Sequence, residues 1–214
     1  VGITTDGTNL YVADARNHLI RKIVISTGVV TTVAGTGSSG SVDGTGTGAS
    51  LNQPIGITTD GTNLYVVDGA NHLIRKIVIS TRVVTKVAGT GSSGSADGTG
   101  TLASFNNPVG ITTDTDGTNL YVADTDNHII RKIVIATGVV TTFAGKGSAG
   151  YFNSTGTNAS FNTPRGITTD GTNLYVADAV NYRIRKIVIS TGLVSTVAGT
   201  GSSGSSNGAG ASAS

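Results

Sequence analysis

Hydrophobic and polar positions alternate along short runs of this chain, and polar turns separate the runs. In the first quarter the runs are Gly2–Thr5, Asn9–Ala13, Leu19–Ile25 and Val29–Ala34. A period of two is typical of a strand with one buried face, and β-branched residues, which suit pleated surfaces, dominate these runs. No segment keeps a period near 3.6 residues over the length of a helix. The pattern predicts an all-β fold built from short strands.

Turn-forming residues join the expected strands. Asp6–Thr8 and Ser26–Gly28 are tight turns, in which glycine supplies a positive φ. The second and third strands are joined by the longer turn Asp14–His18. We therefore expect four antiparallel strands in sequence, connected as hairpins.

This four-strand pattern occurs four times. The pentapeptide Gly-Ile-Thr-Thr-Asp begins at Gly2, Gly56, Gly110 and Gly166, so the units follow at intervals of 54 (2 to 56), 54 (56 to 110) and 56 residues (110 to 166). The third unit is longer because Thr115 and Asp116 are inserted into its first turn. Four strands per unit, with long links between units, predict the blades of a β-propeller. We expect one domain, 1–214, with blades 1–54, 55–108, 109–164 and 165–214.

The second turns carry a family resemblance. Asn17–Leu19 and Asn71–Leu73 read Asn-His-Leu, Asn127–Ile129 differs by one conservative step, and Asn181–Arg183 departs further. With the frame Pro-x-Gly-Ile, Leu-Tyr-Val-Ala-Asp and Asn-His-x-Ile-Arg-Lys, the whole chain resembles the NHL-repeat family, notably its exported bacterial members. The resemblance implies a propeller, and six-bladed rings are common in that family. It implies no single activity, because one fold hosts many.

The number of blades leaves two architectures open. An integer count of repeats with matching ends favours a closed ring of four blades. The alternative is four blades of a larger ring that other residues or another chain complete. In either case a blade cannot bury both of its faces alone, so stability must come from stacking on neighbours.

A charged pair recurs in the third strand of every unit. Neighbouring residues of a strand point to opposite faces, so Arg21 and Lys22 cannot both face solvent unless the strand is exposed on both sides. We expect Arg21 to pair with Asp14; the alternative is two exposed charges on an outer strand. The same pairing is expected of Arg75 with Asp68, Arg131 with Asp124 and Arg185 with Asp178.

The candidate metal ligands do not suggest a site. His18, His72 and His128 occupy equivalent turns, and equivalent residues converge on one ion only near the axis. We expect each to hydrogen-bond a neighbouring backbone instead. The runs Asp114–Gly117 and Asp124–Asn127 are rich in oxygen ligands, but plain turns are favoured over calcium sites because neither run has an acidic closing ligand. No metal or cofactor is predicted.

Composition narrows the function further. The chain has 32 Gly, no Cys, Met or Trp, only 12% charged residues, and a net charge of +2. It begins at Val1, so we expect a processed chain or a fragment. The Thr/Ser/Gly-rich, low-charge composition predicts a secreted or cell-surface protein without a transmembrane helix.

No catalytic set emerges from the sequence. There is no unique Ser-His-Asp combination, no pair of carboxylates outside the repeat register and no phosphate loop. The prediction is a non-catalytic binding or scaffold propeller. The alternatives are a metal-dependent lyase or lactonase, types that occur among NHL-like propellers, and an RNA-binding NHL domain. Nucleic acid is disfavoured because the basic residues outside the repeat register are scattered and most have no aromatic neighbour for stacking.

Loop variation points to one face. Alternate turns emerge on opposite faces, and differences between units concentrate in the second turns and the long links. The third link alone carries two adjacent aromatics, a residue type enriched at interfaces. Leu51, Phe105 and Phe161 are expected to anchor the links. The candidate binding residues are Tyr151, Phe152, Arg16, Asp126 and Arg183.

The expected partner is a protein or a larger extracellular assembly, with self-association left open. Two other interpretations remain. The loop variation could be unrestrained drift after duplication, and Tyr151 and Phe152 could fold inward between the third and fourth blades.

Overall fold

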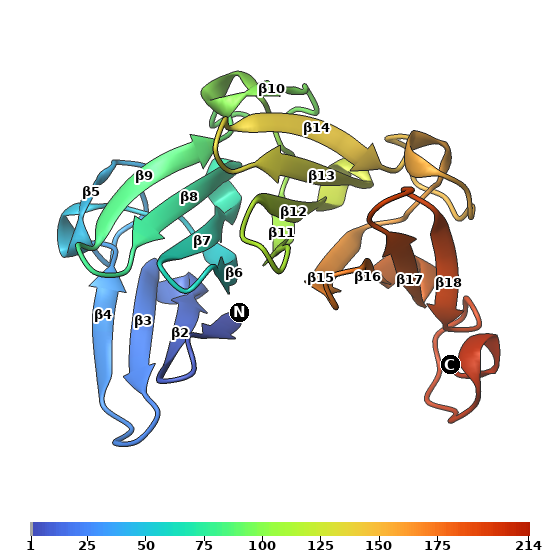
Figure 1. The fold of residues 1–214 in the computed structure, drawn as a ribbon, viewed down its shortest axis with the longest axis horizontal. Helices are drawn as coiled ribbons and strands as arrows, with labels where there is room; N and C mark the ends of the chain where they lie inside the picture. The colour runs from blue at the N-terminus through green and yellow to red at the C-terminus, as the bar shows by residue number, and fades with distance from the viewer. Residues whose placement is uncertain (1) are drawn as a thin grey trace.

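The computed structural model describes residues 2–214 and contains four antiparallel sheets, in each of which the four blade strands follow in sequence order from the inside outward (Figure 1). Val1, with which the first predicted unit begins, lies outside the described residues. Blade 1 comprises β1 (Ile3–Thr5), β2 (Asn9–Asp14), β3 (Leu19–Val24) and β4 (Val30–Ala34). Blade 2 comprises β6 (Pro54–Thr59), β7 (Asn63–Asp68), β8 (Leu73–Val78) and β9 (Val83–Ala88). Blade 3 comprises β11 (Pro108–Thr113), β12 (Asn119–Asp124), β13 (Ile129–Val134) and β14 (Val139–Ala144), and blade 4 comprises β15 (Pro164–Thr169), β16 (Asn173–Asp178), β17 (Arg183–Val188) and β18 (Val194–Ala198).

The predicted strands are confirmed, and the ends in blade 1 differ by one residue from those expected. The links also contain short strands, which the repeat pattern did not predict. β5 (Gly44–Thr45) pairs with β9 of the next blade, and β10 (Gly98–Thr99) pairs with β14. A single bridge between Thr155 and Leu193 does the same for blade 4. Each link therefore covers the outer edge of the blade that follows it, where unpaired backbone groups would otherwise be exposed.

The helices within residues 2–214 are 3₁₀ turns of three residues each. Those of the second turns are η1 (Ala15–Asn17), η3 (Gly69–Asn71), η5 (Thr125–Asn127) and η7 (Ala179–Asn181). Those of the links are η2 (Gly46–Gly48), η4 (Gly100–Leu102), η6 (Gly156–Asn158) and η8 (Gly210–Ser212). None exceeds the single turn that the strand pattern allows.

The histidines connect one blade to the next. Each ends a second turn in the left-handed conformation, with φ between 53° and 57°. Nδ1 of His18 accepts a hydrogen bond from the backbone N–H of Gln53 at 3.1 Å. His72 and His128 do the same for Asn107 and Thr163, both at 3.0 Å. The predicted backbone role of the three histidines is confirmed.

Three apolar clusters fill the spaces between neighbouring blades. Between blades 2 and 3, Tyr65, Val67 and Ile74 lie on one side and Leu120 and Val122 on the other. The side chains predicted to anchor the links are fully buried in these clusters: Leu51, Phe105 and Phe161. A blade is therefore stabilised by its neighbours, as stacked repeats require.

The blades form an open arc. The inner strands contact one another in the order β1, β6, β11, β15, while the outer parts of blades 1 and 4 stand apart at the two ends (Figure 1). Val30 of blade 1 is 49% exposed where Val84 is fully buried, and Ile184 of blade 4 is 41% exposed where Ile74 is fully buried. The arrangement matches four blades of a larger ring and not the closed four-bladed ring that the repeat count favoured.

The predicted arginine–aspartate pairs occur in three blades. Arg75 contacts Asp68 at 2.9 Å, and the equivalent distances in blades 3 and 4 are 3.1 Å and 2.7 Å, with all six side chains fully buried. Each guanidinium also binds the preceding link: Arg75 donates to the carbonyls of Ser50 and Val42 and to the carboxylate of Asp43. We refer to this arrangement as the arginine clamp.

The pairing predicted for blade 1 is wrong. Within residues 2–214 no ion pair joins Arg21 to Asp14, and both side chains are only half-buried. Asp14 accepts hydrogen bonds from Asn17 instead, at 3.0 Å. The reason is that a clamp needs acceptors from a preceding link, and no link packs against blade 1 in the part of the chain described.

Candidate functional site

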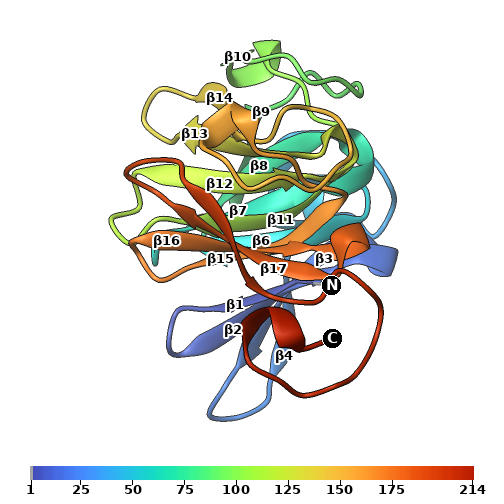
Figure 2. The same ribbon diagram turned by 90° about the vertical axis from the view of Figure 1, so that its right-hand side faces the viewer.

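The propeller has two chemically different faces. The first and third turns lie together, because Ile25 N–H donates to the carbonyl of Thr8 at 3.1 Å. The second turns and links lie together on the other face, where Ala70 N–H donates to Asn52 at 3.2 Å. Figure 2 shows the first-turn hairpins at one side of the molecule and the last link at the other. The predicted division of the loops between two faces is confirmed.

On the link face, an aromatic ring and a guanidinium form a fixed pair. The Arg183 guanidinium carbon lies 3.9 Å from the ring centre of Tyr151, within cation–π range. The Tyr151 hydroxyl shares a hydrogen bond with Thr196 Oγ1 at 3.0 Å. Arg183 in turn donates to the carbonyls of Asn181 at 3.1 Å and Thr200 at 3.0 Å. Both side chains are thus held at each end, which lowers the entropy that a binding partner would have to restrict.

The neighbouring Phe152 projects outward. Its ring is 60% exposed and Tyr151 is 44% exposed, so the two aromatics do not plug the space between blades 3 and 4. The Phe152 carbonyl accepts a hydrogen bond from buried Arg185 at 3.1 Å, which fixes its backbone. Phe152 therefore presents an apolar ring to solvent from a rigid support.

The structure brings together Tyr151, Phe152 and Arg183 of the predicted binding residues. Arg16 in η1 and Asp126 in η5 are exposed on the same face, but they belong to the second turns of blades 1 and 3. We call Tyr151, Phe152 and Arg183 the aromatic cluster.

Two exposed residues in the second turn of blade 4 were missed. Tyr182 is 50% exposed and Val180 is 51% exposed. Tyr182 stands where the other blades have histidine, in the same left-handed conformation (φ 50°). The signal was present in the sequence as the departure of Asn181–Arg183 from Asn-His-Leu. These residues extend the apolar surface toward the open face of blade 4, where Tyr182 and Ile184 line a hollow of about 340 Å³.

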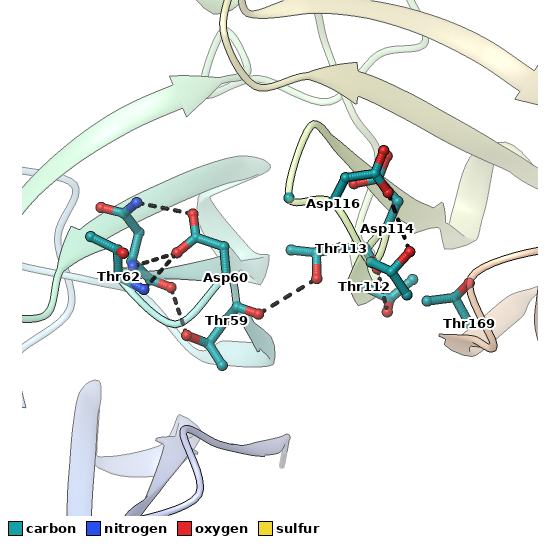
Figure 3. Close-up of a pocket in the computed structure, with 11 residues that line it drawn as sticks. Thr59, Asp60, Thr62, Thr112, Thr113, Asp114, Asp116 and Thr169 are labelled. Atoms are coloured by element: carbon teal, nitrogen blue, oxygen red, sulfur yellow. Dashed lines mark hydrogen bonds between the residues drawn. The ribbon is translucent and has the colours of Figure 1, made fainter.

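The opposite face holds a larger hollow, which we call the first-turn cavity. Its volume is about 610 Å³ (Figure 3). Residues of blades 2, 3 and 4 line it, namely Thr59, Asp60, Thr62, Asn63, Thr112, Thr113, Asp114, Thr115, Asp116, Gly117 and Thr169. Although most differences between units lie on the link face, the first turn that carries the Thr115–Asp116 insertion lies on this one.

Two carboxylates of the cavity hold their own turns. Burial raises the pKa of Asp60, but hydrogen bonds from the Asn63 side chain, the N–H groups of Asn63 and Thr62, and the Tyr65 hydroxyl outweigh it and lower the pKa overall. The pKa of Asp114 is lowered in the same way, against burial, by Asn119 and Thr118. Both groups are therefore ionised at neutral pH, and their oxygens are occupied by the turn itself.

The insertion of Thr115 and Asp116 reshapes the rim of this cavity. In the regular turns the last strand threonine donates to an asparagine carbonyl, as Thr59 does to Asn63 at 2.8 Å. Thr113 instead directs its hydroxyl across the blade interface to the Thr59 carbonyl, at 3.5 Å (Figure 3). On the other side the enlarged turn touches blade 4, since a Cβ added at Gly171 would lie 2.9 Å from Cγ2 of Thr115. One irregular turn thus spans three blades.

The cavity can supply hydrogen bonds and negative charge. Its lining contains neither lysine nor arginine and no histidine. Across residues 2–214, no three histidine, cysteine or acidic side chains are grouped so that they could hold a metal ion. Nor does any helix in that range have the length and apolar character to cross a membrane.

Comparisons with known proteins agree with the repeat pattern. The family model for the NHL repeat matches residues 105–133, which confirms the resemblance noted in the sequence. NHL repeat-containing protein 2 of Bos taurus is 35% identical over 144 residues, which is 63% of this chain and 20% of that protein. The chain thus spans about a fifth of the length of this relative.

Solved structures show the same fold. A Bacteroides thetaiotaomicron protein of unknown function aligns with a TM-score of 0.73 and 28% identity, covering 86% of this chain and 46% of that one. An auxiliary nutrient binding protein from the same organism gives 0.68 and 23%, covering 91% and 47%. A virginiamycin B lyase from Staphylococcus aureus gives 0.58 and 18%, covering 91% and 54%. The chain therefore contains an NHL repeat and has a propeller fold that it shares with proteins named as a nutrient binding protein and a lyase.

Proposed function

We propose that this NHL-type propeller is a non-catalytic recognition module that binds a protein partner through its link face. The observation that carries the proposal is the aromatic cluster. Its members are the only adjacent aromatics in the sequence, Tyr151 and Phe152, together with the arginine that stacks on the first of them.

The chemistry of the cluster favours a protein partner. Tyrosine and arginine are enriched among the residues that carry most of the binding energy at protein interfaces. The stacked pair is already ordered, so binding would cost little side-chain entropy. The adjacent residue Phe152 adds exposed apolar surface, whereas a nucleic-acid interface would need a cluster of positive charge.

Two features argue against the lyase or lactonase alternative. Such an enzyme would need histidine and acidic ligands that converge on one ion. The three histidines of this chain stand in different blades, and each uses Nδ1 to hold the backbone of the next blade. Assays of the purified chain on lactones with added divalent metals are expected to show no turnover; metal-dependent turnover would contradict the non-catalytic assignment.

The proposed location is outside the cell, either on the cell surface or in the medium. Support for it is compositional: only 12% of residues are charged, cysteine is absent, and Gly, Ser and Thr dominate the loops. Fractionation of the native source, followed by immunodetection, tests this part separately. Detection inside the cell alone would refute the location without touching the contact surface.

The contact surface is tested by site-specific photocrosslinking in the native source. A photoreactive residue at position 152 is expected to capture one protein. The matched control is position 42, because Val42 is the equivalent of Phe152 in the first link and is 63% exposed. Capture of the same proteins with equal yield from both positions would mean that the aromatic cluster is not a specific contact.

A further inference from the structure

We propose that the first-turn cavity, on the face opposite the aromatic cluster, binds a polyhydroxylated small molecule such as a monosaccharide or a linear polyol. The volume of about 610 Å³ falls within the range of small-molecule sites, roughly 300–1,000 Å³. Three consecutive blades contribute to the walls, and a rigid scaffold of this kind presents side chains in fixed positions (Figure 3).

The lining selects for hydroxyl groups. Six of the lining residues are threonines, among them Thr59, Thr112 and Thr169 (Figure 3). A hydroxyl both donates and accepts hydrogen bonds, and a carboxylate only accepts. A polyol satisfies both kinds of group. An apolar ligand would offer no hydrogen bonds to this polar lining.

The acidic lining of the cavity disfavours anionic ligands. Asp60, Asp114 and Asp116 all line the cavity and no basic side chain accompanies them. An anion would therefore be repelled. A metal ion is disfavoured because the carboxylate oxygens of Asp60 and Asp114 already accept hydrogen bonds from the N–H and side-chain groups of their own turns.

Asp116 is the lining carboxylate that still has free hydrogen-bond acceptor positions. Among the hydrogen bonds within residues 2–214, its carboxylate accepts only one, from Thr115 Oγ1 at 3.2 Å. The side chain is exposed at the cavity rim. Its remaining lone pairs can accept two adjacent hydroxyls of one ligand. The Thr113 hydroxyl donates to the Thr59 carbonyl and not to the asparagine carbonyl of its own turn, and its oxygen provides a second point of contact in the cavity.

The cavity lies at the first turn that carries the two-residue insertion. Deletion of Thr115 and Asp116 converts the turn of blade 3 into Asp-Gly-Thr-Asn, the sequence that the other three blades already fold. This deletion is therefore a matched variant: it removes the proposed anchor while restoring a turn that the chain is known to accommodate. Lys146→Ala, which removes an exposed charge from the third link on the opposite face, is the surface control.

The test is a titration of the protein in which amide chemical shifts are followed by nuclear magnetic resonance. The titrants are glucose, galactose and mannitol, and, in a separate experiment, calcium chloride alone. At least one sugar or polyol is expected to give saturable shifts at the amides of Thr62, Thr113 and Asp116. The affinity should fall at least tenfold in the deletion variant and in Asp116→Ala, and stay unchanged in Lys146→Ala.

Three results would overturn the proposal. The first is the absence of saturable shifts with every sugar and polyol. The second is unchanged affinity in the deletion variant when its melting temperature shows that it is folded; Asp116→Ala keeps this arm decisive if the deletion fails to fold. The third is a saturable response at these amides to calcium alone, which would identify a cation site instead.

Discussion

Replacing Arg75 by alanine should be far more costly than replacing Arg21, although the two residues occupy the same position in successive repeats. Arg75 and Asp68 are fully buried and 2.9 Å apart, and the guanidinium also serves Asp43 and two link carbonyls. Its removal leaves the Asp68 carboxylate buried without its cation, which typically costs about 3–5 kcal/mol. Arg21 is half-buried and has no ion-pair partner within residues 2–214, so its loss should cost about 1 kcal/mol or less.

The measurement is urea unfolding of both variants under identical conditions, followed by far-ultraviolet circular dichroism, with calorimetry as a second probe because stacked repeats can unfold in steps. A loss of 4 kcal/mol corresponds to roughly a thousandfold change in the ratio of folded to unfolded chains. Arg75→Ala combined with Asp68→Ala should cost less than the sum of the two single changes. Equal losses for Arg75→Ala and Arg21→Ala, or additivity in the double variant, would refute the clamp.

Three further predictions concern packing and pH. Ile74→Ala should lower the free energy of unfolding by about 2–5 kcal/mol, and the equivalent Ile184→Ala by much less, because Ile184 lies on the open face; urea unfolding compares them. Gly56→Ala should lower the melting temperature sharply, since its Cβ would overlap the Val109 carbonyl, whereas at Gly166 an added Cβ would lie 3.7 Å from Ala177, an ordinary contact. The pKa of Asp60 is lower in the folded than in the unfolded chain. The ionised carboxylate therefore contributes to the free energy of unfolding above the unfolded pKa of about 3.9, and this contribution is lost as pH falls through the folded pKa. Asp60→Asn should make the free energy of unfolding less dependent on pH in the acid range, as monitored by circular dichroism.

Much of the fold follows from local pattern. Strand alternation and the spacing of Gly-Ile-Thr-Thr-Asp gave the blades with their ends to within a residue in blade 1. The histidine hydrogen bonds and three of the four arginine–aspartate pairs were also predictable, because both members lie within one repeat or its immediate neighbour.

The remaining features depend on how repeats meet. The clamp requires Asp43, which is 32 residues before Arg75 and in another segment, so the exception at Arg21 could not be read from its own repeat. Ring closure depends on the angle between blades, which an integer count of repeats does not determine. The first-turn cavity depends on Thr113 facing Thr59 across a blade interface. Its sequence signal was the two-residue insertion, which was interpreted as a plain turn.

The role of the aromatic cluster as a contact surface on a rigid scaffold is tested most directly by the affinity of the crosslinked partner. This affinity is measured by calorimetry for the native chain and for Tyr151→Ser combined with Phe152→Ser, with Val42→Ser as the matched control. We expect a loss of about 2 kcal/mol or more, roughly thirtyfold, with an unchanged melting temperature and an unaffected control. Unchanged affinity, or a loss that accompanies a clear fall in melting temperature, would contradict this role.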